Sequence, residues 1–433
     1  MRILVLGGYG LIGSHVVRRL IDAGYDVAGL GRGTARAERR EPSVIWIAAD
    51  LGALTSAAAW APVLARSRPV AIVNCAGALQ DGARDDVSRV QSDAMRALYE
   101  AAAAAGVTRV IQISAPRADP KRDTAFMRSK GEADAALSAS ALDWVILRPG
   151  LVLSPEAYGG SALLRALAAV PLVQPVAFAD CLVQTVSADD VADAVVQVLD
   201  GKIETRRVYD LVEDHAHSLG DILDKMRAWL GIAPAPVVYV PSRLIYAVAR
   251  VADGLGWLGW RSPLRTTAIS ELSNGVTGDP APWRAQSKRA LSSLETTLRH
   301  MPSTVQERWY ARAFLFKPVA IAALSLFWLA SGVIALFDVG RAASVLTSRG
   351  GDGALASIMV IGGAIIDIML GLAILRRTSM PWAAMGMIAV TLAYLIGGTL
   401  LAPGLWLDPL GPLVKAIPGI ALALGVLALA EDR

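Results

Sequence analysis

Hydrophobic and polar positions along the first 150 residues alternate between short apolar runs and amphipathic stretches. The chain opens with an apolar run at residues 3–6, a glycine-rich turn and an amphipathic stretch at residues 14–23, which predicts a strand, a tight turn and a helix. The pattern then repeats, with strands predicted at residues 26–30, 44–48, 70–74, 109–114 and 144–147 and helices at residues 88–105 and 124–140. This alternation predicts an α/β fold with a doubly wound parallel sheet.

The last quarter of the chain is apolar and nearly free of charge. Residues 318–337 hold no charged side chain over 20 positions, which at about 1.5 Å per residue matches a hydrocarbon core about 30 Å thick. Three more apolar runs follow, and none of the four has the polar face that a soluble helix needs. We therefore predict a bundle of four transmembrane helices, at about residues 318–337, 353–375, 380–402 and 412–430.

Over the whole chain, 54% of the residues are hydrophobic and 18% are charged. Such a composition excludes a disordered chain. The formal net charge of +4 combines −2 over residues 1–236, +6 over residues 237–317 and zero over residues 318–433. We predict three domains with these boundaries: an α/β domain, a basic and mainly helical lobe, and a transmembrane domain.

The basic lobe interleaves tryptophan with arginine. Its tryptophans are Trp257, Trp260, Trp283 and Trp309. This composition suits either nucleic acid or a membrane surface, and the nearness of the first transmembrane run favours the membrane. A ligand pocket beside this lobe would open close to the lipid bilayer, which predicts a lipophilic substrate and no nucleic-acid partner. A membrane-protein partner is compatible with the same layout.

Lysine and arginine beside the apolar runs predict the topology. Five of them precede the first run or follow the second, whereas Arg341, Arg349 and Lys415 lie in the opposite loops. This excess places both termini and the α/β domain in the cytoplasm, below an inner or plasma membrane. Two cysteines, Cys75 and Cys181, are too few for a disulfide framework.

Asp367 lies within the second apolar run, where an ionised carboxylate costs roughly 2.5–3.5 kcal/mol on insertion. We therefore expect it to face other helices, either as a proton or quinone contact or as a helix–helix hydrogen bond. His215 and His217 have no third ligand at useful spacing, and no metal site is predicted.

Three glycines, spaced three residues apart, follow the first strand. Glycine at these positions lets the backbone approach a pyrophosphate and places that anion at the N-terminus of the next helix. This spacing predicts a dinucleotide site. The expected cofactor contacts from the turn are Gly7, Tyr9, Gly10, Leu11, Ile12 and Gly13.

The ends of the following strands indicate which dinucleotide is bound. A site for NAD usually carries an acid after the second strand, but here Arg32 stands there and suits the 2′-phosphate of NADP(H). We therefore predict NADP(H) in preference to NAD(H). Further cofactor contacts are expected from Asp50, Leu51, Cys75, Ala76 and Gly77.

Six segments, taken in order, resemble the extended and atypical short-chain dehydrogenase/reductase family: GGYGLIG, NCAG, IQISAP, FMRSKGEAD, ILRPG and TVSADDVADAV. The resemblance covers about residues 1–230 and implies an NAD(P)-binding Rossmann domain. Residues 237–317 are similar to the substrate-side lobe of membrane-linked members. The last quarter is similar, in length, position and hydropathy, to the DoxX-like domain fused to such proteins.

The resemblance also implies a catalytic Tyr-x-x-x-Lys pair, and the chain departs from it at one position. In the family the lysine holds the nicotinamide ribose, and the tyrosine passes a proton to a carbonyl group. Ser114 and Lys130 match the family's serine and lysine, but Phe126 occupies the tyrosine position and has no proton to give. Pro149 is expected to shape the nicotinamide pocket.

Two functions are compatible with this pattern. The first is a membrane-anchored, NADPH-dependent oxidoreductase that acts on a lipophilic quinone-like or carbonyl compound and takes its proton from another group. The second is a non-catalytic NADPH-binding scaffold or redox sensor, which Phe126 favours.

Overall fold

The computed structural model describes residues 1–82, 86–347 and 352–431. The chain forms two compact units: unit 1 is Met1–Asp253 with Ser262–Ala311, and unit 2 is Gly254–Arg261 with Arg312–Arg433. The division into three domains stays a prediction.

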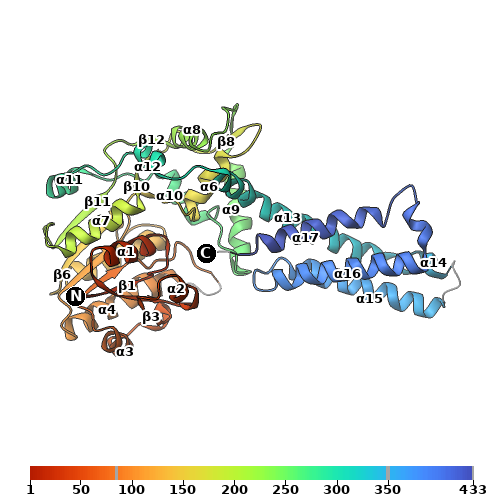
Figure 1. The fold of residues 1–433 in the computed structure, drawn as a ribbon, viewed down its shortest axis with the longest axis horizontal. Coiled ribbons are helices and arrows are strands. Elements are labelled where there is room, and N and C mark those ends of the chain that lie inside the picture. The colour runs from red at the N-terminus through yellow and green to blue at the C-terminus, as the bar shows by residue number, and fades with distance from the viewer. Residues whose placement is uncertain (83–85, 348–351, 432–433) are drawn as a thin grey trace. The chain divides into compact units, whose positions relative to one another are not determined.

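A seven-stranded parallel sheet is the centre of unit 1, in the order β11-β6-β5-β4-β1-β2-β3 (Figure 1). Its strands are β1 (Arg2–Leu6), β2 (Asp26–Gly31), β3 (Ile45–Ala48), β4 (Ala71–Asn74), β5 (Arg109–Ile113), β6 (Asp143–Pro149) and β11 (Arg207–Leu211). Ile3 and Val5 of β1 belong to one apolar core, and Leu4 and Leu6 belong to another. The sheet is therefore covered on both faces, which confirms the predicted doubly wound architecture.

Helices form a layer on each face of the sheet. α1 (Leu11–Asp22) and α7 (Ala188–Leu199) pack on one face, and α3 (Ala57–Ser67), α4 (Ala94–Ala104) and α5 (Ala125–Ser138) pack on the other (Figure 1). Short α2 (Ala35–Arg40) joins the first layer through Ala37. Because the strands are parallel, the loops at their carboxyl ends meet at one edge of the sheet, where ligands of such folds bind.

The rest of unit 1 is a mainly helical lobe. α6 (Gly159–Ala168), α8 (Leu219–Trp229) and α12 (Leu294–His300) enclose a separate apolar core. Its other helices are α9 (Ser242–Trp257), which ends in unit 2, α10 (Thr266–Ser273) and α11 (Ala281–Ser287). Its short strands pair as β7 (Leu151–Leu153) with β10 (Thr185–Ser187), β8 (Gln174–Val176) with β13 (Val237–Tyr239), and β9 (Leu182–Val183) with β12 (His217–Ser218).

Trp283 was expected at a membrane surface, and that prediction is wrong. It is buried in the core of the α/β sheet, with its ring 5.7 Å from that of Tyr209 in an edge-to-face arrangement. The reason is that α11 packs against β11, so its tryptophan contributes to the core rather than to an exposed belt.

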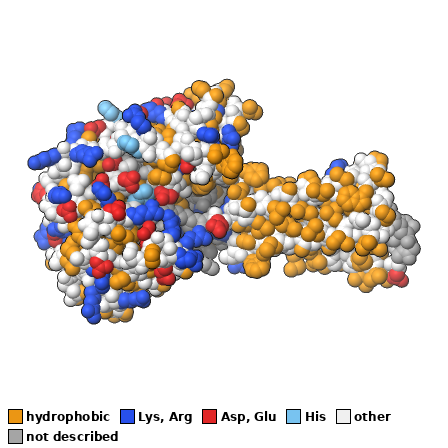
Figure 2. Space-filling view, in the orientation of Figure 1, with side chains coloured by type: hydrophobic (Ala, Val, Ile, Leu, Met, Phe, Trp, Pro, Cys, Tyr) orange, Lys and Arg blue, Asp and Glu red, His pale blue; other side chains and the backbone are white. Residues whose placement is uncertain are grey.

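Unit 2 is an apolar helical bundle. Its helices are α13 (Val305–Phe337, which begins in unit 1), α14 (Val339–Thr347), α15 (Gly353–Ala373), α16 (Met380–Leu401) and α17 (Ile417–Ala428). Among the described residues, α13, α15 and α16 are long and apolar enough to cross a membrane, whereas α17 has only 12 residues. Hydrophobic side chains cover most of the face of this bundle that Figure 2 shows. The four predicted apolar helices are thus present, and unpredicted α14 is added.

The first of these helices begins at Val305 rather than near residue 318. Residues before Pro318 carry charges, which hide the helix from a hydropathy pattern, and membrane helices tolerate an internal proline. Arg349, one of the residues used to predict the topology, lies outside the described residues.

Candidate active site

The glycine turn between β1 and α1 is shaped by close backbone contacts. Gly7 has a positive φ of 67°, its N–H donates to Leu30 O at 2.9 Å, and its carbonyl accepts from Gly10 N at 2.8 Å. A Cβ on Gly13 would overlap the Gly7 carbonyl oxygen. Gly10 caps α1 without a side-chain hydrogen bond, so the amides of the first turn, at Leu11 and Ile12, are available to an anion. The turn therefore fits a dinucleotide pyrophosphate.

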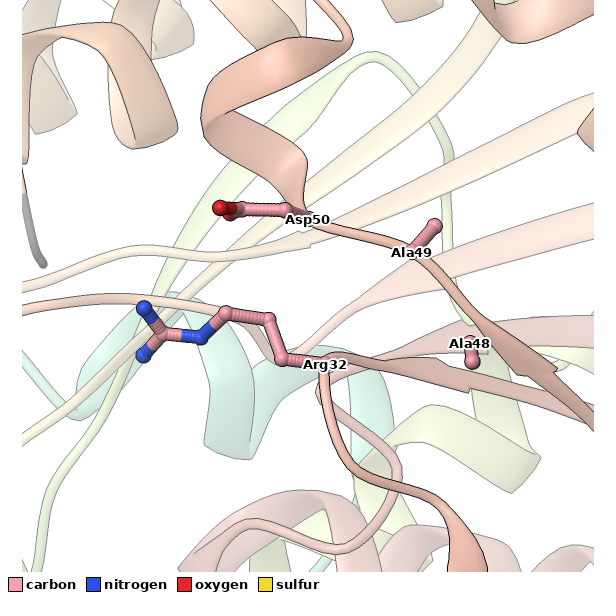
Figure 3. A pocket seen from close by; sticks show the side chains of 4 residues that line it. All are labelled: Arg32, Ala48, Ala49 and Asp50. Atoms are coloured by element: carbon pink, nitrogen blue, oxygen red, sulfur yellow. The ribbon is translucent and has the colours of Figure 1, made fainter.

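An open pocket of about 500 Å³ lies at the ends of β2 and β3, lined by Arg32, Ala48, Ala49 and Asp50. The Arg32 and Asp50 side chains extend to the same side of these strand ends (Figure 3). Arg32 and Asp50 therefore line one hollow, whereas the neighbouring Leu51 side chain is buried in the core.

Tyr9 has a structural role in the same region. Its hydroxyl accepts hydrogen bonds from the backbone N–H of Arg32 at 3.0 Å and of Gly33 at 3.3 Å. Its ring fills the space where a Cβ on Gly31 would be. Tyr9 therefore fixes the backbone that presents the Arg32 side chain.

The loop after β4 lies between the glycine turn and Lys130. A Cβ on Gly7 would come within 2.9 Å of Ala76 Cα, and a Cβ on Gly77 within 3.4 Å of Lys130 Nζ. Burial raises the pKa of the Cys75 thiol to about 12, although Lys130 opposes the shift. Cys75 is therefore suited to packing and not to nucleophilic chemistry.

Ser114 directly follows β5, and Lys130 reaches the end of the same strand from α5. The Lys130 ammonium donates to Ile113 O at 2.8 Å, and both side chains are buried. Burial lowers the pKa of Lys130 to about 8, although nearby Asp134 opposes this. Phe126 lies one turn before Lys130 on α5. Pro149 ends β6 at the same edge of the sheet.

Asp134 completes this cluster, and sequence reasoning missed it. Its Oδ2 accepts from the Ser114 hydroxyl at 2.8 Å and from Arg148 Nη2 at 2.9 Å, while its buried Oδ1 has no hydrogen-bond partner among the described residues. Burial raises the pKa of this carboxyl, although Arg148 and Ser114 oppose the shift. The sequence spacing could have identified Asp134, because it follows Lys130 by four residues and therefore lies on the same face of the helix.

A second cluster of ionisable side chains, centred on the buried His15, links α1 to α7. His15 Nδ1 lies 2.7 Å from Asp189 Oδ1, and Nε2 lies 2.9 Å from Glu156 Oε2. Burial alone would lower the pKa of His15, but hydrogen bonds to the two carboxylates outweigh it and raise the pKa to about 9. His15 is therefore protonated at neutral pH and holds the helix that carries the glycine turn.

We expect this cluster to make stability depend on alkaline pH. The folded pKa of His15, about 9, exceeds the ordinary histidine value of 6.5, so its contribution is fully present below pH 6.5 and is lost as pH rises through 9. Because the Asp189 side chain is exposed and its ion pair is screened by solvent, we expect His15 to contribute only about 1–2 kcal/mol to the free energy of unfolding. The melting temperature of the His15→Gln protein should fall below that of the wild type at pH 6.5, and the gap should narrow by pH 10. A gap independent of pH would contradict the charged role.

Glu213, His217 and Glu295 bring possible metal ligands within 4.8 Å of one another. Lys225 already supplies a positive charge there, through an ion pair with Glu295 at 2.7 Å. Glu213 also accepts backbone N–H groups from Thr185 and Leu294 at 2.8 Å each. The cluster is thus held together by its own residues, and the expectation of no metal stays a prediction.

Asp367 in the bundle bonds to two neighbouring helices. Its carboxylate accepts from the Ser331 hydroxyl of α13 at 2.9 Å and from the Tyr394 hydroxyl of α16 at 3.3 Å. Of the two roles left open by the sequence, the structure shows the helix–helix hydrogen bond.

Fold and glycine turn together define a nicotinamide-nucleotide-binding Rossmann protein. Residues 7–202 match the NAD(P)H-binding family, and residues 325–424 match the DoxX-like family. The chain thus combines an NAD(P)H-binding Rossmann domain with a C-terminal DoxX-like domain, as the two resemblances implied. The apolar helices and the DoxX-like domain indicate association with a membrane.

Known proteins extend the comparison. A 3-diazoavenalumate denitrifying reductase from a Streptomyces species is 30% identical over 197 residues, which cover 39% of this chain and 62% of that protein. The chain thus matches less than two thirds of this relative's length.

Solved structures support the fold. WbmG from Bordetella bronchiseptica, in complex with NAD and UDP, has a TM-score of 0.55 at 18% identity, covering 72% of this chain and 96% of its own. The UDP-glucose 4-epimerase of Thermus thermophilus, in complex with NAD, has a TM-score of 0.51 at 21% identity, covering 69% and 98%. These structures show the fold, and the match to the NAD(P)H-binding family indicates a nicotinamide cofactor.

Proposed function

We propose that this protein is a membrane-anchored, NADPH-dependent reductase that acts on a lipophilic quinone-like or carbonyl acceptor. The observation that carries the proposal is a complete glycine turn, with Ser114 and Lys130 at the carboxyl edge of the sheet, on a chain that also contains an apolar helical bundle. The reductase relative supports the reaction class. The excess of Lys and Arg before α13 and after α15 supports both termini and unit 1 in the cytoplasm, at an inner or plasma membrane.

Some of the site residues would bind the cofactor, and one would take part in the chemistry. The glycine turn would hold the pyrophosphate, Arg32 the 2′-phosphate, and Lys130 the nicotinamide ribose. When bound, the cofactor supplies a hydride. Phe126 cannot supply the accompanying proton, but Lys130 has a pKa of about 8 and is therefore suited to donate one near neutral pH.

A small hollow of about 60 Å³ beside Met127 supports an acceptor with a polar head. Its lining is mostly polar and comes from the loop before α5, from α5 itself and from α10: Arg117, Arg122, Asp123, Thr124, Met127, Ser270, Glu271 and Asn274. Arginine and hydroxyl groups there can hydrogen-bond the oxygens of a quinone or carbonyl group.

Arg32 should determine the choice of cofactor. A charged hydrogen bond contributes about 1.5–3 kcal/mol, so Arg32→Ala should weaken NADPH binding by about 10- to 100-fold and leave NADH binding almost unchanged. Fluorescence titration of both cofactors measures this directly. Arg39→Ala is the matched control, because Arg39 is exposed on α2 and does not line the pocket. Equal wild-type affinities for NADH and NADPH would reject the preference.

Turnover by protein purified from membranes tests the reaction. We expect quinones, enones or ketones to oxidise NADPH in its presence, and Phe126→Tyr to raise kcat for simple ketones by about 100-fold, because the new phenol gives a proton. The Phe126→Tyr substitution should change the affinity for NADPH little. Failure of the whole panel to oxidise bound NADPH would reject the proposal.

Phe126 also favours a second function, a non-catalytic NADPH-binding scaffold or redox sensor that assembles with a membrane protein partner. This function requires the glycine turn and Arg32 but no proton donor. It is distinguished by NADPH binding without turnover in both the wild-type protein and the Phe126→Tyr variant.

A further inference from the structure

Helix α9 carries an apolar stripe that no part of the described protein covers. Leu244, Val248 and Val251 are 56%, 41% and 65% exposed, and their spacing of four and three residues places them on one side of the helix. The buried face is a different one, because Ala249 and Ala252 pack into the protein. The stripe is therefore a second apolar face, facing away from the lobe's interior.

The chain immediately before α9 is also apolar and exposed. Val237, Val238 and Tyr239 form β13, which pairs with β8, and all three are exposed; Leu172, just before β8, is exposed as well. Figure 2 shows hydrophobic side chains gathered at the end of unit 1 where Figure 1 labels β8. Exposed apolar groups of this extent mark an interaction surface.

The carboxyl end of α9 is fixed to the membrane bundle. Residues Gly254–Arg261 belong to unit 2, where Trp260 Nε1 donates to Leu375 O at 2.6 Å and Leu258 O accepts from Arg377 N at 3.1 Å. The turn that contains these two partners joins α15 to α16, where the apolar spans end and arginines begin. Such a turn is expected at the bilayer surface. The last residues of α9, Gly254–Trp257, belong to unit 2 with this turn, and the rest of the helix continues from them along the chain.

Charge on α9 fits anionic lipid headgroups. Arg243 and Arg250 are exposed, lie seven residues apart and flank the stripe on one side. The acidic side chain of the helix, Asp253, is engaged by Arg265 Nε at 3.0 Å and by the Thr266 hydroxyl at 2.7 Å. A helix with apolar side chains on one side and arginine beside them is typical of binding in the interfacial region of a bilayer.

We propose that α9 lies in the headgroup region of the bilayer that the DoxX-like helices span. Leu244, Val248 and Val251 enter the acyl boundary, and Arg243 and Arg250 contact anionic headgroups. A second copy of the chain is the less suitable occupant, because a stable dimer buries about 800 Å² per partner and engages about 20–30 residues on each side. The exposed apolar residues of α9, β13 and Leu172 are far fewer than that.

Binding of α9 to lipid would hold the adjoining part of unit 1 at the bilayer surface. Asp253 of α9 is bonded to Arg265 and Thr266 at the start of α10, and Glu271 of α10 accepts a hydrogen bond from Thr124, which caps α5 two residues before Phe126. Helix α9 is therefore connected through α10 to the helix that carries Lys130.

Site-directed fluorescence on the full-length protein in lipid nanodiscs tests the proposal without reference to turnover. Single cysteines replace Leu244, Val248, Val251, Arg243 or Arg250 in a Cys75→Ser, Cys181→Ser background whose NADPH affinity is checked first, and each carries an environment-sensitive dye. We expect nitroxide lipids to quench the dyes at 244, 248 and 251, and aqueous iodide to quench those at 243 and 250. Val208→Cys, exposed on β11, is the matched control and should respond to iodide alone.

Lipid composition provides a second readout. Quenching by nitroxide lipid at 248 should be stronger with phosphatidylglycerol than with phosphatidylcholine alone, and an Arg243→Glu, Arg250→Glu variant should lose that difference. Iodide quenching at 248 and 251 equal to that at 208 would overturn the proposal, since the stripe would then face water. Protection from both quenchers would overturn it as well, since protein would then cover the stripe.

Discussion

Gly13→Ala is expected to weaken NADPH binding by at least about tenfold and to lower the stability of the protein. The added methyl group would overlap the carbonyl oxygen of Gly7 and would lie 2.9 Å from the Gly7 carbonyl carbon. That carbonyl accepts from Gly10 N at 2.8 Å, so moving it displaces the whole turn and the amides that face the pyrophosphate. Overpacking of this kind costs about 1–3 kcal/mol of stability, and the displaced anion site adds a loss of at least about tenfold in affinity, or 1.4 kcal/mol.

Gly33→Ala is the matched control for this substitution. A Cβ on Gly33 meets nothing within 4 Å, and its φ is not positive. NADPH titration and thermal melting of both variants therefore separate the steric effect from the general effect of replacing a glycine near the cofactor. NADPH binding by Gly13→Ala equal to that of Gly33→Ala would show that the turn is not the pyrophosphate site.

Six of the seven strands could be predicted because they are buried on both faces and therefore appear as short continuous apolar runs. β11 was missed. It is the end strand of the sheet, and its Arg207 and Val208 are exposed while Tyr209 and Leu211 are buried. A five-residue strand with this mixed composition has too little periodicity to be separated from a loop.

The candidate site was predictable where its chemistry depends on local spacing. The glycine turn and the position of Lys130 are set within a few residues of chain. His15 could not be recognised in this way, because its partners Glu156 and Asp189 are 141 and 174 residues away in the sequence. Trp283 shows the same limit, because only the folded chain brings it against Tyr209.

Membrane helices were predictable from hydropathy, but their ends were not. Residues 305–317 of α13 carry charges and form helix with no apolar signal. α17 is shorter than its apolar run indicated, because a 3-10 turn at Val414–Ala416 precedes it and the helix ends at Ala428. Composition measures which residues suit lipid, whereas helix ends depend on backbone hydrogen bonds.

Asp134→Ala should have the largest effect on stability of any substitution in the candidate active site. The change leaves Arg148 without its carboxylate partner and the Ser114 hydroxyl without its acceptor. Breaking a buried pair costs about 3–5 kcal/mol, because an uncompensated charge stays in the interior. Arg148 keeps a hydrogen bond to Ala118 O at 3.1 Å, so we expect a loss of stability near the lower end of this range. A fall in melting temperature measures it.

A double-mutant cycle tests whether the loss of stability comes from the Asp134–Arg148 ion pair. Arg148→Met alone should destabilise the protein because it leaves the Asp134 carboxylate buried and uncompensated. Asp134→Ala with Arg148→Met should cost less than the two single changes together by at least about 1 kcal/mol, since residues in one ion pair are coupled. Asp134→Asn keeps an acceptor for Ser114 and should fall between the wild type and Asp134→Ala. Additive effects in the cycle would mean that Asp134 stabilises the site through packing and not through its charge.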